Sequence, residues 1–390
     1  MPVINRIAAL SEEIALWRRD IHRHPELGFQ ELRTAGVVAD KLRAFGCDEV
    51  VPGIGKTGVV GVIRGNRPGT GKARVIGLRA DMDALPIEEA TGLSYQSQSA
   101  GRMHACGHDG HTSMLLGAAK YLAETRNFAG TAVLIFQPAE EGGGGGREMV
   151  NEGMMERFGI EEVFGLHNKP GLPVGAFELR PGPFMAAADR FTVEITGKGA
   201  HAAYPQLSVD PIVAGCQIVT ALQSIVARNV DPVKSAVVSV TVFEAGTAHN
   251  IIPNSATLKG TVRTFDAAVQ DMIEARLRTL VDLTAKAHGA TANIDYQRYY
   301  PATINHEAQT RFAAAVAAEV AGEARVSTNA PLSLGAEDFS FMLNARPGAM
   351  IWMGNGDTAG LHHPAYDFND AAIPVGASYW ARLVETAMGG

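Results

Sequence analysis

Side chains that bind metals or move protons recur in this 390-residue sequence, mostly just after apolar runs typical of β-strands. They are Asp81, Asp83, Cys106, His108, Glu140, Glu141, His167, His362 and His363. In an open α/β sheet, functional side chains gather where the strands end and the loops turn into helices. Carboxylate, imidazole and thiolate groups together suit one or two divalent transition-metal ions.

Some of these groups also have a purely structural interpretation. Asp81 and Asp83 taken alone are typical of turn or cap residues, and His167 taken alone is typical of a buried structural histidine. The adjacent Glu140 and Glu141 are different, because they lie between an apolar strand and a glycine run rather than in a polar loop. In a metal site, one such glutamate ligates while its neighbour takes a proton from metal-bound water and delivers it to a leaving amine.

Cys106 and His108 stand just before a segment with a helical apolar stripe. A helix N-terminus lowers the pKa of a thiol and favours the thiolate, which both a metal site and a cysteine nucleophile require. A nucleophile has no use for two adjacent glutamates and further histidines, so the distant residues favour the metal site. We expect structural roles for His104 and His111, and a helix cap at Asp109.

The bulk composition is that of a globular protein, with 46% apolar and 19% charged residues. The net charge of −7 comes without any basic run, which argues against nucleic acid and anionic membranes as partners. The first residues do not resemble a signal peptide, no apolar run reaches membrane-spanning length, and the three cysteines lie far apart. We therefore expect a cytoplasmic protein without disulfides.

The N-terminal half alternates strand-like and helical segments. Residues 4–42 have helical patterning that is interrupted near Pro25. Beyond them, one helical segment lies among four strand-like runs, which cover residues 57–65, 73–81, 131–140 and 162–170. This alternation predicts an α/β fold with a mostly parallel sheet.

A second rhythm occupies residues 187–298, where strand and helix patterns follow the order β-α-β-β-α-β of a ferredoxin-like unit. Prolines flank this stretch on both sides, as is common at a domain boundary. The strand-like run at residues 348–356 can then return to complete the first sheet. We predict one domain from residues 1–186 and 299–390, and an inserted domain over 187–298.

The inserted domain carries His201 in a turn of small residues, Asn250 in a polar loop and Arg263 in an otherwise neutral strand. A lone strand arginine is commonly a surface residue. Together, however, an arginine, an asparagine and a histidine make a good receptor for a carboxylate and an oxyanion. The spacing alone leaves both interpretations open.

Ten segments in order, between residues 22 and 370, resemble the aminoacylase and carboxypeptidase family of metal-dependent amidohydrolases. The similarity is to its branch of hippurate hydrolases and N-acyl- or indole-acetyl-amino-acid hydrolases. The segments are HRHPELGFQE, RADMDALPI, HACGHDGHT, FQPAEEGGGGG, GLHN, GKGAHAAYP, HNIIPN, GTVRTF, GAEDFS and LHHPAYDFND.

The resemblance implies a zinc-peptidase-like catalytic domain split by a ferredoxin-like lid that forms a homodimer or a higher homo-oligomer. It also implies two divalent metal ions, with zinc, manganese, nickel and cobalt as candidates. The matching ligand positions are Cys106, His108, Glu141, His167 and His362. Glu140 matches the general acid/base that activates metal-bound water, and Asp83 a residue that orients a ligand histidine. Asp81 stays outside the ligand set, and His362 rather than His363 matches the histidine that follows a leucine.

By the same resemblance, His201 reaches a neighbouring subunit's site and polarises the scissile carbonyl, while Asn250 and Arg263 hold the free carboxylate of the substrate. The implied reaction is hydrolysis of the amide of a small N-acyl-amino acid. Two alternatives from the residues remain: a hydrolase with Cys106 as nucleophile, and a non-catalytic dimer that binds an amino-acid-like ligand.

Overall fold

The computed structural model describes residues 3–69 and 74–389, which form two compact units. The first unit comprises Met1–Gly182, Ile304–Pro331 and Asp338–Gly390. The second unit comprises Pro183–Thr303 and Leu332–Glu337. The predicted insert over 187–298 lies within the second unit, which also takes in a short stretch of the chain after its return.

The first unit is built on an eight-stranded sheet in the order β1-β2-β4-β3-β5-β16-β6-β15. The strands are β1 Glu49–Ile54, β2 Gly58–Arg64, β3 Arg74–Asp81, β4 Gly130–Gln137, β5 Glu162–Pro170, β6 Phe177–Glu178, β15 Val326–Ser327 and β16 Gly348–Gly356. The centre is parallel, with β3 between β4 and β5, and β16 beside β5. The predicted α/β fold and the late return to the first sheet are confirmed; the first residue of the expected strand 73–81 lies outside the described residues.

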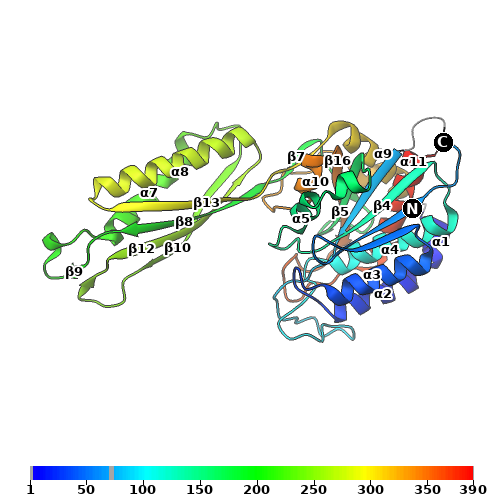
Figure 1. Ribbon diagram of the computed structural model, residues 1–390, viewed down its shortest axis with the longest axis horizontal. Helices are drawn as coiled ribbons and strands as arrows, with labels where there is room; N and C mark the ends of the chain where they lie inside the picture. The colour runs from blue at the N-terminus through cyan, green and yellow to red at the C-terminus, as the bar shows by residue number, and fades with distance from the viewer. Residues whose placement is uncertain (1–2, 70–73, 390) are drawn as a thin grey trace. The chain divides into compact units, whose positions relative to one another are not determined.

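Helices pack around this sheet (Figure 1), and α4, which begins at the candidate ligand His108, is largely buried. The helices of the first unit are α1 Asn5–Ala9, α2 Ser11–Arg23, α3 Leu32–Phe45, α4 His108–Thr125, α5 Gly145–Asn151, α6 Met154–Arg157, α9 Glu307–Ala321, α10 Phe339–Ala345 and α11 Ile373–Ala387. Helix α4 packs against α2, α3 and α11. Because it is enclosed by these neighbours, its first turn is held firmly at the edge of the sheet.

The predicted break near Pro25 separates α2 from α3. Within this break, Leu27 forms a parallel bridge with Ala84, and the N–H of Ala84 donates to the carbonyl of Glu26 at 2.8 Å. The segment 24–31 thus runs alongside the chain that leaves the end of β3. It lies next to the polar residues that follow the strands.

The second unit has the predicted β-α-β-β-α-β order. Its elements are β8 Ala187–Thr196, α7 Pro211–Arg228, β10 Ala236–Ala245, β12 Ser255–Thr264, α8 Ala267–Ala287 and β13 Thr291–Tyr300. The antiparallel sheet has the order β10-β12-β8-β13, and α7 and α8 lie side by side along it (Figure 1). Asp210 and Asp266 cap the two helices through their first backbone N–H groups. A small ribbon of β9 Ala200–His201 and β11 Ile251–Ile252 extends from the unit.

Helix α7 corrects one expectation, because by length and composition alone it could cross a membrane. Its inner face, which includes Ala214, Ile218, Leu222 and Ile225, is fully buried in the core of the second unit. The core helix of a globular unit meets the same criteria, so this feature is weak evidence for a membrane span.

Candidate metal centre

Candidate ligands from three loops, the start of α4 and one strand meet in the first unit. Ligand atoms of Cys106, His108 and Glu141 lie within 4.8 Å of one another. His167 on β5 joins them, with its Nε2 3.4 Å from the Cys106 Sγ. Except for the partly exposed Glu141, these side chains are buried. The structure therefore brings together four of the five predicted ligands from distant parts of the sequence.

The two buried imidazoles have their Nε2 atoms directed into this cluster. His108 Nδ1 bonds to the backbone carbonyl of Asp83 at 2.9 Å, and His167 Nδ1 to the carbonyl of Asn168 at 2.7 Å. A carbonyl only accepts, so each Nδ1 carries a proton, and each Nε2 is the nitrogen that can offer a lone pair to a metal. The His108 Nε2 is buried without a hydrogen-bond partner among the described residues. This is the arrangement that a metal-ligating histidine needs.

His111 lies next to this cluster but has no free ring nitrogen. Its Nδ1 bonds to Asp81 Oδ1 at 2.6 Å, and its Nε2 accepts hydrogen bonds from the backbone and side-chain nitrogens of Asn168 at 2.9 and 3.0 Å. Asp81 is further committed to Arg79, 2.8 Å away, although its ligand atoms also lie near His108 and His167. These bonds support the structural role expected for His111 and the exclusion of Asp81 from the ligands.

The pKa of the Cys106 thiol is the opposite of what its position before a helix predicts. Burial, reinforced by the charges of Glu141, Glu140 and Asp81, raises this pKa well above its usual range. Burial and these carboxylates both act against the dipole of α4, which begins only at His108. A raised pKa favours the protonated thiol, which is a poor nucleophile.

The cluster carries an excess of negative charge. Burial opposes the charged form of His108, yet Asp81, Asp83 and Glu141 raise its pKa to about 10. A divalent cation would offset the same charge, and a coordinated thiol is deprotonated by its metal. One thiolate, two imidazoles and a carboxylate form a typical set of donors for zinc and related ions. The residues present therefore fit the metal centre that the sequence predicts.

Asp83 organises the acidic pair rather than only a histidine. Its carboxylate accepts the backbone N–H of Glu140 at 3.0 Å and of Glu141 at 2.9 Å. It also lies 3.3 Å from His108 Nδ1. Glu140 is buried, and its charge acts on Cys106. Asp83 therefore fixes both glutamates relative to the ligands.

The choice between the two neighbouring histidines of the C-terminal loop is clear from their contacts. His362 Nε2 lies 2.9 Å from Glu141 Oε1, and the His362 N–H donates to the carbonyl of Ala105, next to Cys106. His363 instead accepts a hydrogen bond from the backbone of Ala365. The structure places His362, and not His363, at the cluster.

The structure shows what two residues with expected structural roles, Asp109 and His104, contact. Asp109 does not cap α4, whose N-cap is Gly107; its carboxylate binds His22 Nδ1 at 2.8 Å. His104 is buried with no hydrogen bond from either ring nitrogen among the described residues, and burial lowers its pKa to about 4. His104 is therefore neutral and takes no part in the ligand set.

Asn168 is a support residue that the sequence analysis missed. Besides binding His111, its side-chain nitrogen donates to the carbonyl of Cys106 at 2.6 Å, and its oxygen accepts from the Tyr366 hydroxyl at 2.8 Å. Its position directly after His167, in the motif GLHN, was the available signal. Asn168 links the residues around two predicted ligands into one network.

In the second unit, His201 and Asn250 lie together and Arg263 lies apart. His201 pairs with Ile251 across the small ribbon, and both His201 and Asn250 line an open hollow of about 420 Å³. Arg263 is near the other end of β12, eight residues beyond Ser255, which places it roughly 25 Å from the ribbon. Asn250 and Arg263 are therefore too far apart to form one carboxylate receptor within a single chain, and their joint role stays a prediction.

Arg263 is anchored by neutral oxygens only. Its Nε donates to the carbonyl of Leu334 at 3.1 Å, and its Nη1 to Thr261 and to the carbonyl of Val262. No hydrogen bond of Nη2 is found among the described residues. The guanidinium is thus oriented by the protein and retains a donor for an anionic ligand.

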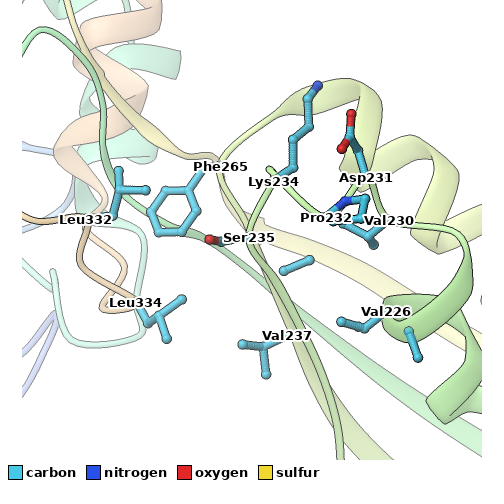
Figure 2. A pocket seen from close by; sticks show the side chains of 12 residues that line it. Val226, Val230, Asp231, Pro232, Lys234, Ser235, Val237, Phe265, Leu332 and Leu334 are labelled. Atoms are coloured by element: carbon cyan, nitrogen blue, oxygen red, sulfur yellow. The ribbon is translucent and has the colours of Figure 1, made fainter.

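A further hollow of about 550 Å³ lies in the second unit (Figure 2). Its apolar lining includes Val226, Val237, Phe265, Leu332 and Leu334. Asp231 and Lys234 stand at its border, and Lys234 is paired with Asp266. The hollow has none of the candidate ligands, so it is not the metal centre.

Known proteins are similar to this chain in sequence and in fold. The model of peptidase family M20/M25/M40 matches residues 77–386. The hippurate hydrolase of Campylobacter jejuni is 44% identical, with 98% of each chain covered. The chain belongs to the M20/M25/M40 peptidase family.

Other members support the same assignment. The N-acetylcysteine deacetylase of Bacillus subtilis is 41% identical, with 94% of each chain covered. The solved YXEP protein of Bacillus subtilis, described as a dinuclear metal-binding peptidase of the M20 family, has a TM-score of 0.85 at 37% identity and covers 98% of this chain and 99% of its own. The resemblance drawn from the motifs is confirmed, and the M20 chain is a metal-dependent amidohydrolase.

Proposed function

We propose that this M20 chain hydrolyses the amide bond of N-acyl-L-amino acids, such as hippurate, to a carboxylate and an amino acid. The observation that carries the proposal is the adjacent Glu140 and Glu141, fixed by Asp83 beside the ligand atoms of Cys106 and His108. One glutamate completes a metal site and the other remains for proton transfer. The hippurate hydrolase and N-acetylcysteine deacetylase among its relatives support this substrate class.

The reaction needs a base that later acts as an acid. Divalent ions bound by Cys106, His108, Glu141, His167 and His362 would act as Lewis acids toward a carbonyl and lower the pKa of water. Glu140 takes a proton from the attacking water as its oxygen bonds to the acyl carbon. The carbon–nitrogen bond then breaks, and Glu140 gives the proton to the departing amino nitrogen. One water and one amide thus give one carboxylate and one amine, and the reaction needs no covalent intermediate on a thiol.

Recognition of the free carboxylate is assigned to the second unit. Arg263 has the charge and a free donor for this role. His201 and Asn250 share a ribbon far along the sheet, so they would reach a site together, and we assign them to the site of a neighbouring subunit. There His201 would stabilise the oxyanion.

A homodimer through the second unit is the assembly that this assignment requires. Edge strand β10 has no charged residue from Ala236 to Phe243, and α7 has none before Arg228. Val213 and Phe243 are 48% and 40% exposed on these two elements. Uncharged, exposed sheet edges pair readily with another strand. Sedimentation analysis should give twice the chain mass; a monomer at micromolar concentration would contradict the assignment.

The experiment that tests the function is a hydrolysis screen of N-acyl-amino acids after reconstitution of the metal-free protein with zinc, manganese, nickel or cobalt. Aromatic and short aliphatic acyl groups should be compared on one amino acid. We expect hydrolysis of at least one N-acyl-amino acid with at least one of these metals. No hydrolysis with any combination would contradict the proposal.

Chelation separates this function from the alternative in which Cys106 is the nucleophile. EDTA should abolish hydrolysis and added metal should restore it. A thiol enzyme would stay active in EDTA. The high pKa of the Cys106 thiol favours the metal-dependent outcome.

We also propose a cytoplasmic location, in keeping with the free Cys47, Cys106 and Cys216.

A further inference from the structure

Two buried carboxylates hold the backbone that leads into Glu140. The N–H of Ala139 donates to Glu31 Oε1 at 2.8 Å, and the next two N–H groups donate to Asp83 at 3.0 and 2.9 Å. Three successive amides are therefore fixed by carboxylates from two distant segments. Asp83 was predicted to support the site, but Glu31 belongs to the motif HRHPELGFQE, to which the proposed reaction gives no role.

The backbone at Ala139 is unusual and sets the direction of the chain at Glu140. Ala139 has a φ of +50°, in the left-handed region that residues with a side chain seldom adopt. Such a conformation persists only where surrounding contacts hold it. The hydrogen bond to Glu31 is one of these contacts, since it fixes the amide on one side of the strained residue.

Packing of the same segment supports this contact. A Cβ on Gly28 would lie 3.0 Å from the Cβ of Ala139 and 3.2 Å from its Cα, so only glycine fits there without a shift. The segment 26–31 is also tied to the chain after β3 by the Leu27–Ala84 bridge. Gly28 and Glu31 thus both contact Ala139 from one rigid segment.

Glu31 is fully buried, and both of its oxygens are used. Its second oxygen accepts the Thr57 hydroxyl at 2.6 Å. Burial, with the nearby charge of Asp83, raises the pKa of this carboxyl. Burying a carboxyl group costs free energy unless its hydrogen bonds are satisfied. The Glu31 carboxylate accepts one hydrogen bond from an amide and one from a hydroxyl. Among the described residues, Glu31 is in none of the groups whose atoms could hold a metal.

We infer that Glu31 is a positioning residue for amide hydrolysis: through the N–H of Ala139 it holds the carboxylate of Glu140 at the reacting water. This inference rests on the proposed role of Glu140. It predicts that loss of Glu31 lowers kcat, while substrate binding and metal content change little. A displacement of a catalytic group by about an ångström is enough to lower the rate on the order of 100-fold.

The first test compares Glu31→Ala, Glu31→Asp and Glu31→Gln. Glu31→Ala should lower kcat by about 30- to 100-fold at nearly constant KM, and Glu31→Asp, one methylene shorter, by about 10-fold. Glu31→Gln should restore most of kcat, because its amide oxygen still accepts the Ala139 N–H. If Glu31→Ala does not fold, the kcat of Glu31→Asp tests the inference instead. Wild-type kcat in the folded variant would overturn the inference.

Glu26→Ala is the matched control in the same segment. The Glu26 carboxylate accepts the N–H groups of Arg33 and Thr34 and the Thr34 hydroxyl, but no group of residues 139–141. We expect Glu26→Ala to lower the melting temperature and leave kcat unchanged. An equal fall of kcat in both variants would mean that Glu31 only stabilises the fold, and it would overturn the inference.

Two further measurements separate this inference from the proposed function. Hydrogen exchange of the holoenzyme at the amides of residues 139–141 should be about tenfold faster in Glu31→Ala than in the wild type, whatever the substrate. In a Glu140→Gln background, Glu31→Ala should cause no further loss of turnover. Full additivity would overturn the inference. If Glu140→Gln kept wild-type turnover, the proposed function would fail, whereas faster exchange would still show that Glu31 holds the segment.

Discussion

The two units hold their functional side chains in different ways. In the first unit, His108 and His167 are buried and each is fixed by a hydrogen bond to a backbone carbonyl. In the second unit, His201 and Asn250 are exposed on a two-stranded ribbon. We therefore propose that the groups for chemistry are arranged before the substrate arrives, while the groups for recognition act only with a ligand and a neighbouring subunit. Substitutions in the two units should therefore fail differently.

The largest effect that sharpens this comparison is expected for Cys106→Ser. A serine hydroxyl does not ionise under conditions where a metal deprotonates a thiol, so metal occupancy and kcat/KM should fall at least about 100-fold. Metal content is measured by mass spectrometry after dialysis. Cys216→Ser, at an exposed position on α7, is the control and should behave as the wild type. Full metal occupancy in Cys106→Ser with no activity would instead favour a thiol nucleophile.

A smaller effect, of another kind, is expected for Arg263→Ala in the second unit. Loss of a charged partner for the substrate carboxylate should raise KM about 30-fold and leave metal content unchanged. The wild type should also discriminate strongly between an N-acyl-amino acid and its carboxamide, and the variant should not. Steady-state kinetics on both substrates test this. Retained discrimination would show that another residue binds the carboxylate.

The smallest effect concerns stability in the buried ionic network behind the site. Burial opposes the charged form of His22, but Asp109 raises its pKa to about 9. Because the folded pKa lies above the unfolded value of about 6.5, the charge of His22 stabilises the fold below pH 6.5, and this contribution is lost as the pH rises toward 9. In His22→Gln, the free energy of unfolding should be lower by up to about 3 kcal/mol at pH 6.5 and nearly equal to the wild type above pH 9.

Urea unfolding at both pH values measures this difference. The exposed His288 of the second unit has no such partner, so His288→Gln should follow the wild type throughout. A wild-type pH profile in His22→Gln would show that the ion pair with Asp109 contributes nothing to stability. The two variants thus compare a buried histidine of the first unit with an exposed histidine of the second.

The fold was largely predictable because its signals are local. The alternation of strands and helices defines the sheet, and the break at Pro25 and the β-α-β-β-α-β order appear where expected. The structure brings the predicted ligands together, and the signal was their residue types at or near a strand end or a helix start; their ligand role stays a prediction. The short strands β6 and β15 were missed, because two residues carry no periodicity.

What could not be predicted depends on distances between remote segments. The raised pKa of Cys106 follows from its burial and from the charges of Glu141 and Glu140, which lie more than thirty residues away in the chain. The separation of Asn250 from Arg263 follows from the length of β12 between them. The hydrogen bond from the N–H of Ala139 to Glu31 joins residues 108 positions apart, so no local pattern indicates it.

The central claim is that Glu140 moves the proton in a centre whose metal is held by its neighbours. The most direct test measures bound metal and turnover of an N-acyl-amino acid in the same preparation of Glu140→Gln. The wild-type metal content should be retained, while kcat falls on the order of 1,000-fold. Turnover near that of the wild type, or loss of the metal together with turnover, would contradict the assignment of Glu140 as the base.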